Sequence, residues 1–133
     1  MITTTLNLRV RYAETDAMGF AYHGNYLVWF EMARVQMLDE IDCPYRELEN
    51  AGYRLPVLEA GARYLRPAAF DDRLSVVAVM REKPGLRMRL DYQVFREGVR
   101  TADGFTRHAF INAEGKPVRP PARFVEKAGA LFG

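Results

Sequence analysis

Apolar and polar residues alternate near the start of the chain, as they do in a strand with one buried face. The apolar positions are Leu6, Leu8, Val10 and Tyr12, and polar residues stand between them. This period of two predicts a strand over residues 6–12. The next segment, residues 13–24, follows neither a strand nor a helix period, and we expect it to be a turn that leads into a helix.

A long apolar helix is predicted after this turn. It should begin at Asn25, a good N-cap residue, and end at about Leu38 or Ile41. Its apolar stripe consists of Tyr26, Trp29, Phe30, Ala33, Met37, Leu38 and Ile41, and Leu27, Val28 and Met32 widen it. Because a surface helix needs a polar face, we expect this helix to lie inside the fold.

Strand patterns dominate the rest of the chain after a short helical turn at residues 45–52. The predicted strands are residues 56–59 with 62–65, broken around Gly61, then 74–81, 87–96 and 99–112. Lys83-Pro84-Gly85 and Glu97-Gly98 mark the hairpins between them. Asp103-Gly104 is either a bulge or a shorter turn. We expect the tail from Gly115, with its three prolines, to be mostly irregular.

One buried helix followed by four or five antiparallel strands is an α+β arrangement, with the sheet wrapped around the helix. At 133 residues the chain is expected to be a single domain, residues 1–133, with a core of its own. A single sheet around one helix leaves strand edges to protect, which favours pairing of identical subunits.

The composition and charge narrow the possible binding partners and the cellular compartment of the protein. A net charge of +2 is too small to suggest nucleic-acid binding, and no apolar run approaches the ~20 residues of a membrane span. The single cysteine, Cys43, excludes an internal disulfide and fits a reducing compartment. With no signal-peptide pattern at the N-terminus, the protein is expected in the cytoplasm.

The most distinctive candidate chemistry is a carboxylate, Asp16, placed just before the helix. A helix N-terminus presents unpaired N–H groups and a positive dipole end, so it can hold an oxyanion. A carboxylate near such donors could carry out acyl transfer. The alternative is an aspartate that only forms an Asx-turn. Glu14, two residues earlier, is expected to be structural.

Other mechanisms lack the necessary residues. The only serine, Ser75, lies within a strand pattern, and Cys43 has no nearby histidine. Two histidines, His23 and His108, are too few and too far apart to indicate a zinc site, and no glycine loop of the nucleotide-binding type is present. We therefore predict no cofactor and no metal.

The segment around Asp16 resembles the signature of the hotdog-fold acyl-CoA thioesterases. The branch it is most similar to is that of 4-hydroxybenzoyl-CoA thioesterase and its bacterial acyl-CoA relatives. The residues that carry the resemblance are Tyr12, Glu14, Thr15, Asp16, Met18, Gly19, Tyr22, His23, Asn25, Tyr26, Trp29, Phe30, Glu31, Ala33 and Arg34. It continues through residues 52–57, 64–67 and 72–74.

The resemblance implies catalytic roles for three residues of this segment, Asp16, His23 and Gly24. Asp16 would be the catalytic carboxylate, as nucleophile or as general base, and the backbone N–H of His23 or Gly24 would face the thioester carbonyl. The His23 side chain is also a candidate contact for the acyl group or the attacking water. In the 4-hydroxybenzoyl-CoA enzyme a tyrosine occupies this position, whereas other bacterial relatives carry histidine, so a hydroxybenzoyl substrate is not predicted.

Substrate-binding residues are expected on the helix and at hairpin ends. Tyr22, Asn25, Tyr26 and Trp29 are candidates to line the acyl pocket, although an aromatic stripe at helical spacing is more often plain core. Basic residues near hairpin ends, Lys83 and Arg87 among them, could meet the phosphates of CoA, or they could be ordinary solvated charges. Glu31 and Arg34 are spaced to pair on the helix.

The predicted function is hydrolysis of an acyl-CoA thioester to a free acid and CoA. The alternative is a non-catalytic module that binds acyl-CoA or acyl-carrier protein. The histidine-containing signature of hotdog dehydratases is absent. By resemblance the protein should be a homodimer with active sites between subunits, or a homotetramer built as a dimer of dimers.

Overall fold

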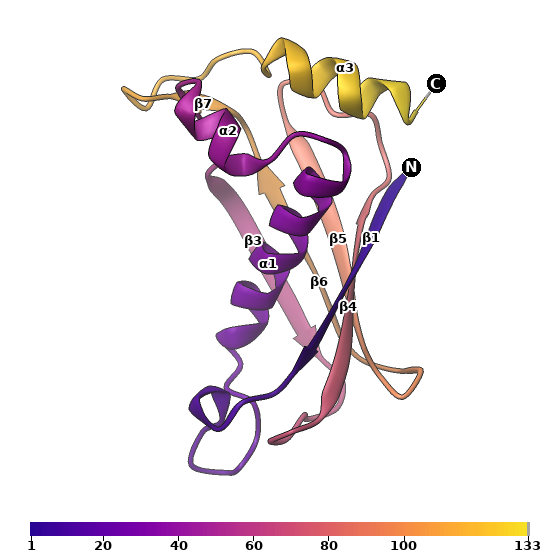
Figure 1. Cartoon of the computed structure of the whole chain (residues 1–133). Coiled ribbons are helices and arrows are strands. Elements are labelled where there is room, and N and C mark those ends of the chain that lie inside the picture. The colour runs from indigo at the N-terminus through magenta and orange to yellow at the C-terminus, as the bar shows by residue number, and fades with distance from the viewer. Residues whose placement is uncertain (133) are drawn as a thin grey trace.

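A curved antiparallel sheet wraps around one long helix in the computed structural model, which describes residues 1–132 (Figure 1). The main sheet has the strand order β1-β4-β5-β6-β3, with every neighbouring pair antiparallel. Its strands are β1 (Ile2–Arg9), β3 (Val57–Tyr64), β4 (Arg73–Met80), β5 (Met88–Arg96) and β6 (Val99–His108). The other elements are η1 (Tyr12–Glu14), α1 (Asn25–Glu40), α2 (Tyr45–Asn50), β2 (Tyr53–Arg54), β7 (Ile111–Asn112) and α3 (Ala122–Ala130). The predicted α+β arrangement is confirmed.

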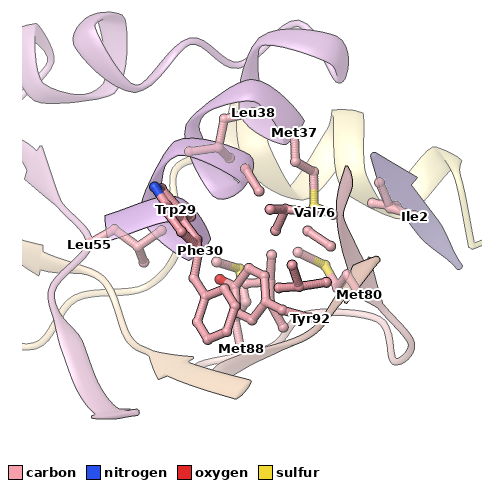
Figure 2. Packing of buried hydrophobic residues seen from close by; sticks show 14 of the residues in the cluster. Ile2, Trp29, Phe30, Met37, Leu38, Leu55, Val76, Met80, Met88 and Tyr92 are labelled. Carbon is pink, nitrogen blue, oxygen red and sulfur yellow. The ribbon is translucent and has the colours of Figure 1, made fainter. Parts of the chain in front are cut away.

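Helix α1 forms the centre of the core, as predicted, but only one of its faces is covered. Figure 2 shows its apolar side chains meeting those of the sheet, with Phe30 stacked on Tyr92 at 4.3 Å between ring centroids. Gly104 makes this approach possible, because a Cβ there would lie 2.6 Å from the Phe30 ring. The opposite face, with Leu27, Val28 and Met32, stays exposed. The sheet of a single chain therefore covers one side of the helix and leaves these residues uncovered.

The first strand begins earlier than the predicted residues 6–12. Ile2 and Thr4 are buried and Thr3 is exposed, so the alternation already starts at residue 2 with threonines. The chain leaves the ladder after Arg9, and Tyr12 belongs to the short helix η1.

The broken strand predicted around Gly61 is continuous, since β3 runs through it with an irregularity only between Val57 and Glu59. Asp103-Gly104 is neither a bulge nor a turn. Gly104 pairs regularly with Ala62 and Tyr92, and the irregularity of this hairpin falls between Val94 and Phe95.

The predicted irregular tail is wrong for residues 122–130, which form α3. Phe124 and Ala128, four residues apart, are its buried face, and the helix covers the end of the sheet near both chain termini (Figure 1). Arg123 and Lys127 on the same helix hold Asp42, just after α1: Arg123 Nε donates to the Asp42 carbonyl at 2.9 Å and Lys127 Nζ lies 3.2 Å from its carboxylate.

A buried polar network links α1 to the sheet. Nη1 of Arg34 lies 3.0 Å from Nδ1 of His108, and Nε2 of His108 lies 2.8 Å from the Thr106 hydroxyl. The predicted pairing of Arg34 with Glu31 is wrong: Glu31 is exposed and makes no ion pair within residues 1–132. Burial, together with the nearby Arg34 charge, lowers the pKa of His108 to about 4.

This network predicts that the protein loses stability in mild acid. Unfolded His108 takes up a proton near pH 6.5, whereas the folded protein resists protonation until about pH 4. Its contribution is therefore complete above pH 6.5 and falls as the pH drops towards 4, by about 3 kcal/mol in total. Urea unfolding between pH 7 and pH 4.5 should show this decline, and His108→Gln should flatten it. An equally steep decline in His108→Gln would contradict the assignment.

No helix among residues 1–132 combines the length and the apolar character needed to cross a membrane.

Candidate active site

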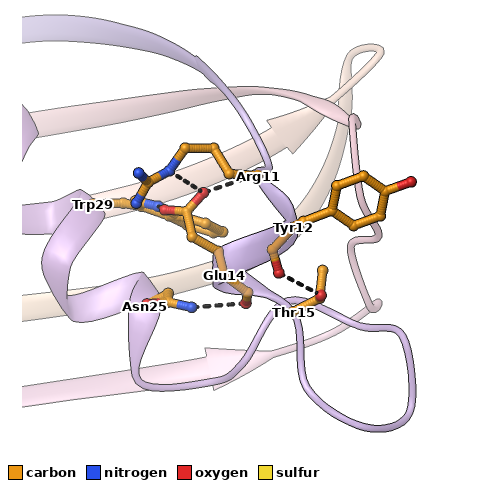
Figure 3. Close-up of polar contacts among 6 residues, drawn as sticks. All are labelled: Arg11, Tyr12, Glu14, Thr15, Asn25 and Trp29. Carbon is orange, nitrogen blue, oxygen red and sulfur yellow. Dashed lines mark hydrogen bonds and ion pairs between the residues drawn. The ribbon is translucent and has the colours of Figure 1, made fainter.

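A buried carboxylate, Glu14, fixes the turn between η1 and α1. Glu14 Oε1 accepts the Arg11 N–H at 2.9 Å, and Oε2 accepts the indole N–H of Trp29 at 2.9 Å (Figure 3). Its backbone carbonyl accepts the side-chain amide of Asn25 at 2.8 Å and the N–H of Tyr22 at 2.7 Å. Burial alone would raise the pKa of Glu14, but these hydrogen bonds and Arg11 bring it below its usual value. This matches the structural role predicted for Glu14.

Asp16 is half-buried in the turn that Glu14 anchors, and one of its carboxylate oxygens is already used. Oδ1 accepts the N–H groups of Met18 at 2.9 Å and Phe20 at 3.3 Å, which is an Asx-turn. Gly19 closes the turn with a φ of 84°. Oδ2 has no hydrogen-bond partner among residues 1–132. The carboxylate is therefore held in one orientation with an oxygen to spare.

A cavity of about 300 Å³ opens beside Asp16. Its walls come from the turn, from the start of α1 and from the segment that follows β3. They consist of Asp16, Met18, Phe20, Ala21, His23, Tyr26, Tyr64, Leu65, Arg66 and Pro67. A mostly apolar cavity with one oriented carboxylate suits a small apolar group attached to a reacting centre.

Two consecutive backbone N–H groups stand unpaired where α1 begins. The N–H groups of Tyr22, Asn25 and Tyr26 donate to carbonyls of the turn, whereas those of His23 and Gly24 donate to no acceptor within residues 1–132. They precede a helix of 16 residues, whose dipole places positive potential at this end. Such donors could bind a carbonyl oxygen or an oxyanion.

Three predicted substrate contacts hold the turn and do not line the cavity. Trp29 is only 1% exposed and bonds Glu14. Asn25 is the first residue of α1 and not its N-cap, which is Gly24, and its amide is used by the Glu14 carbonyl. The Tyr22 ring lies 4.3 Å from that of His23 and covers Gly24. Only Tyr26 and His23 of the predicted helix-start residues reach the cavity.

The loop between β4 and β5, which contains Lys83 and Arg87, lies at the other end of the sheet from the loop that leads into α1 and contains Asp16 (Figure 1). In the β1–β4 ladder, Arg9 and Arg73 pair near the Asp16 turn, and Ile2 and Met80 pair near Lys83. These eight-residue strands separate the two ends by roughly 25 Å. Lys83 and Arg87 line a second, larger cavity of about 780 Å³, together with Leu58, Glu59, Arg81, Glu82, Pro84, Met88, Arg89, Asp91 and Arg107. One chain alone does not bring these cations to Asp16.

Comparison with known proteins identifies the family. The sequence model of the thioesterase-like superfamily matches residues 10–128. The chain belongs to this superfamily. A protein of Aquifex aeolicus (strain VF5) named "Putative esterase" is 32% identical over 118 residues, 89% of this chain and 91% of that protein. The "Putative acyl-CoA thioesterase YneP" of Bacillus subtilis (strain 168) is 29% identical over 84% of this chain and 83% of that protein.

The solved structures agree with this assignment. A DHNA-CoA thioesterase from Staphylococcus aureus superposes with a TM-score of 0.92 at 29% identity, over 99% of this chain and 91% of that one. The predicted hotdog fold and the predicted enzyme class, a thioesterase, are thereby confirmed.

Sequence reasoning missed the part of this thioesterase that forms the far wall of the Asp16 cavity. Tyr64, Leu65, Arg66 and Pro67 belong to the family resemblance, yet no periodicity indicates that they adjoin the turn. The structure joins the two segments through the Ala21 N–H, which donates to the Ala68 carbonyl at 2.7 Å, and a bridge from Phe20 to Ala69. Among residues 1–132, no group of three or more His, Cys, Asp or Glu side chains could hold a metal ion.

The Glu14 contacts predict a large loss of stability when the carboxylate is removed. In Glu14→Ala the buried Trp29 indole and the Arg11 N–H lose their acceptor, which should lower the free energy of unfolding by about 2 to 3 kcal/mol. Urea unfolding at pH 7 measures this. Glu126→Ala, at an exposed position of α3, should change it by less than about 0.5 kcal/mol. Equal effects of the two substitutions would show that Glu14 does not anchor the turn.

Proposed function

We propose that this thioesterase hydrolyses an acyl-CoA thioester to a free acid and CoA at the Asp16 cavity. The observation that carries the proposal is the joint presence of an oriented carboxylate with a spare oxygen and two unpaired N–H groups at the start of α1. The names of the Bacillus subtilis and Staphylococcus aureus proteins, which refer to acyl-CoA and DHNA-CoA, support CoA thioesters as the substrate class.

The geometry supports a short sequence of steps. The thioester carbonyl oxygen accepts the N–H of Gly24 or His23, and this stabilises the negative charge that develops on it. Asp16 Oδ2 either attacks the carbonyl carbon, giving a mixed anhydride that water then cleaves, or removes a proton from an attacking water. In both routes the C–S bond breaks and CoA leaves as a thiolate. Because a thiol has a pKa of about 8.5, this leaving group needs little help from an acid.

The edge strand β3 supports assembly into a homodimer. Six of the eight residues of β3 are exposed, Val57 and Leu58 about half, whereas β1 at the other edge alternates exposed residues with buried or partly buried ones. An uncovered apolar edge strand is a pairing site. A two-fold axis makes the two β3 strands antiparallel, so the Tyr64 end of one copy meets the Val57 end of the other.

This pairing would complete the site across two subunits. Tyr64 lines the Asp16 cavity, and Leu58 and Glu59, at the other end of β3, line the basic cavity. Lys83 and Arg87 of a second copy would then lie beside the Asp16 cavity. There they could bind the phosphates of a CoA whose thioester occupies that cavity. Arginine and lysine suit this role as phosphate donors.

The outer face of α1 supports a further contact between dimers. Leu27, Val28 and Met32 are exposed on this face of the single chain, and a second dimer packed there would cover them. We keep the homotetramer, built as a dimer of dimers, as the proposed assembly. The cytoplasmic location stays a prediction from the sequence.

Release of free CoA tests the proposed function. The purified protein is incubated with short, medium, long and aromatic acyl-CoA thioesters and a thiol-trapping dye. We expect rapid thiol release from at least one acyl class, which also identifies the acyl group. Tight binding of these thioesters without release from any of them would instead indicate a non-catalytic binding module.

A further inference from the structure

We infer that Tyr64 is a positioning residue, which holds the peptide between His23 and Gly24 with its N–H directed at the thioester. The inference rests on the proposed function. It is based on a hydrogen bond between two residues that line the cavity: the Tyr64 hydroxyl donates to the backbone carbonyl of His23 at 2.9 Å. This is the carbonyl of the same peptide group whose N–H belongs to Gly24.

The two ends of this peptide group have different partners. The His23 carbonyl accepts the Tyr64 hydroxyl and, at 3.3 Å, the N–H of Tyr26, whereas the Gly24 N–H has no acceptor within residues 1–132. In a trans peptide the C=O and the N–H point in opposite directions, so fixing the oxygen also fixes the direction of the hydrogen. A hydrogen bond to the oxygen polarises the peptide and makes its N–H a stronger donor.

Tyr64 is itself held rigidly, as a positioning residue must be. It is the last residue of β3 and pairs with Ala102 of β6, and the next two N–H groups, of Leu65 and Arg66, both donate to the Thr101 carbonyl. The Tyr64 ring packs edge-on against that of Tyr26, at 5.0 Å between centroids. Partial burial raises the pKa of Tyr64, so its hydroxyl stays protonated, and a donor, at neutral pH.

Tyr64 also forms part of the cavity wall, but the role inferred for its hydroxyl is a different one. A wall residue acts on the bound substrate and changes KM, whereas a residue that strengthens the oxyanion donor acts mainly in the transition state and changes kcat. Tyr64 also lies on β3, the proposed pairing strand, so subunit pairing and the oxyanion donor would share one rigid element.

Tyr64→Phe tests the inference, because it removes only the hydroxyl. We expect kcat to fall about 5- to 10-fold with KM within about twofold of the wild type, as suits the loss of one neutral hydrogen bond. In NMR spectra of labelled protein, the Gly24 amide nitrogen and the His23 carbonyl carbon should shift as that carbonyl loses its donor. Tyr12→Phe is the matched control, since the Tyr12 hydroxyl is exposed and has no partner among residues 1–132. It should leave kcat and both resonances unchanged.

The outcomes separate this inference from the proposed function. Wild-type kcat in Tyr64→Phe, a change confined to KM, or unmoved Gly24 and His23 resonances would overturn the inference while leaving acyl-CoA hydrolysis in place. Absence of CoA release by the wild-type protein would overturn both. The NMR spectra also establish that Tyr64→Phe is folded.

Discussion

Asp16→Asn should lower kcat for acyl-CoA hydrolysis by about 10²-fold or more while acyl-CoA binding persists. The fold should survive, because an asparagine oxygen can accept the same N–H groups of Met18 and Phe20 that Asp16 Oδ1 accepts now. The spare Oδ2 oxygen of Asp16 is replaced by an amide nitrogen, which is neither a base nor a useful nucleophile. The loss should therefore appear in turnover and not in the binding of CoA.

Steady-state CoA release and equilibrium binding, measured side by side, test this prediction. Asp39→Asn is the control, since Asp39 is an exposed aspartate on α1 and should keep wild-type turnover. If Asp16→Asn hydrolysed its best substrate at nearly the wild-type rate, Asp16 would be only a turn residue. The catalytic group would then have to be sought at His23 or Glu31.

Two variants that are each impaired at low substrate concentration should restore activity when they share a dimer. Lys83→Glu combined with Arg87→Glu reverses two charges of the basic cavity and should raise KM by about 10-fold or more. Mixed with Asp16→Asn under conditions that exchange subunits, half of the dimers are hybrids. Each hybrid carries one site with Asp16 from one copy and both cations from the other. About a quarter of wild-type turnover should return at low substrate concentration.

The arrangement of subunits decides the outcome of this mixing experiment. The control mixes each variant with itself, which should restore nothing. If Asp16 and the cations served one site within a single chain, or if the cations did not bind the substrate, no mixture would exceed the sum of its parts. Such a result would contradict the proposed site between subunits.

The sequence was most informative where the determinants are local. The apolar stripe from Tyr26 to Leu38 predicted α1 almost to the residue, and the hairpin at Glu97-Gly98 forms as expected, with positive φ angles of 49° and 79°. The hydropathy pattern gave a wrong strand boundary where polar residues are buried. Thr4 faces the core at 3% exposure because a β-branched side chain packs well in a strand, so β1 was predicted to start four residues late.

Sequence patterns could not indicate which residues far apart in the chain become neighbours in the fold. Helix α3 buries Phe124 and Ala128 at the end of the sheet. The prolines before it had indicated an irregular tail instead. Tyr64 reaches the His23 carbonyl from 41 positions away in the chain. Lys83 and Arg87 were predicted as substrate contacts without any indication that they lie at the far end of the sheet. The three-dimensional arrangement shows that a single chain does not bring them to Asp16.

The most direct test of the central claim is a structure of Asp16→Asn with an uncleaved acyl-CoA bound. We predict that the thioester carbonyl oxygen lies within hydrogen-bond distance of the Gly24 or His23 N–H, about 2.7 to 3.1 Å, with the substituted side chain at position 16 beside the carbonyl carbon. The CoA phosphates should then approach Lys83 and Arg87 of the other subunit. A thioester bound away from the start of α1, with the cavity beside position 16 left empty, would contradict the account.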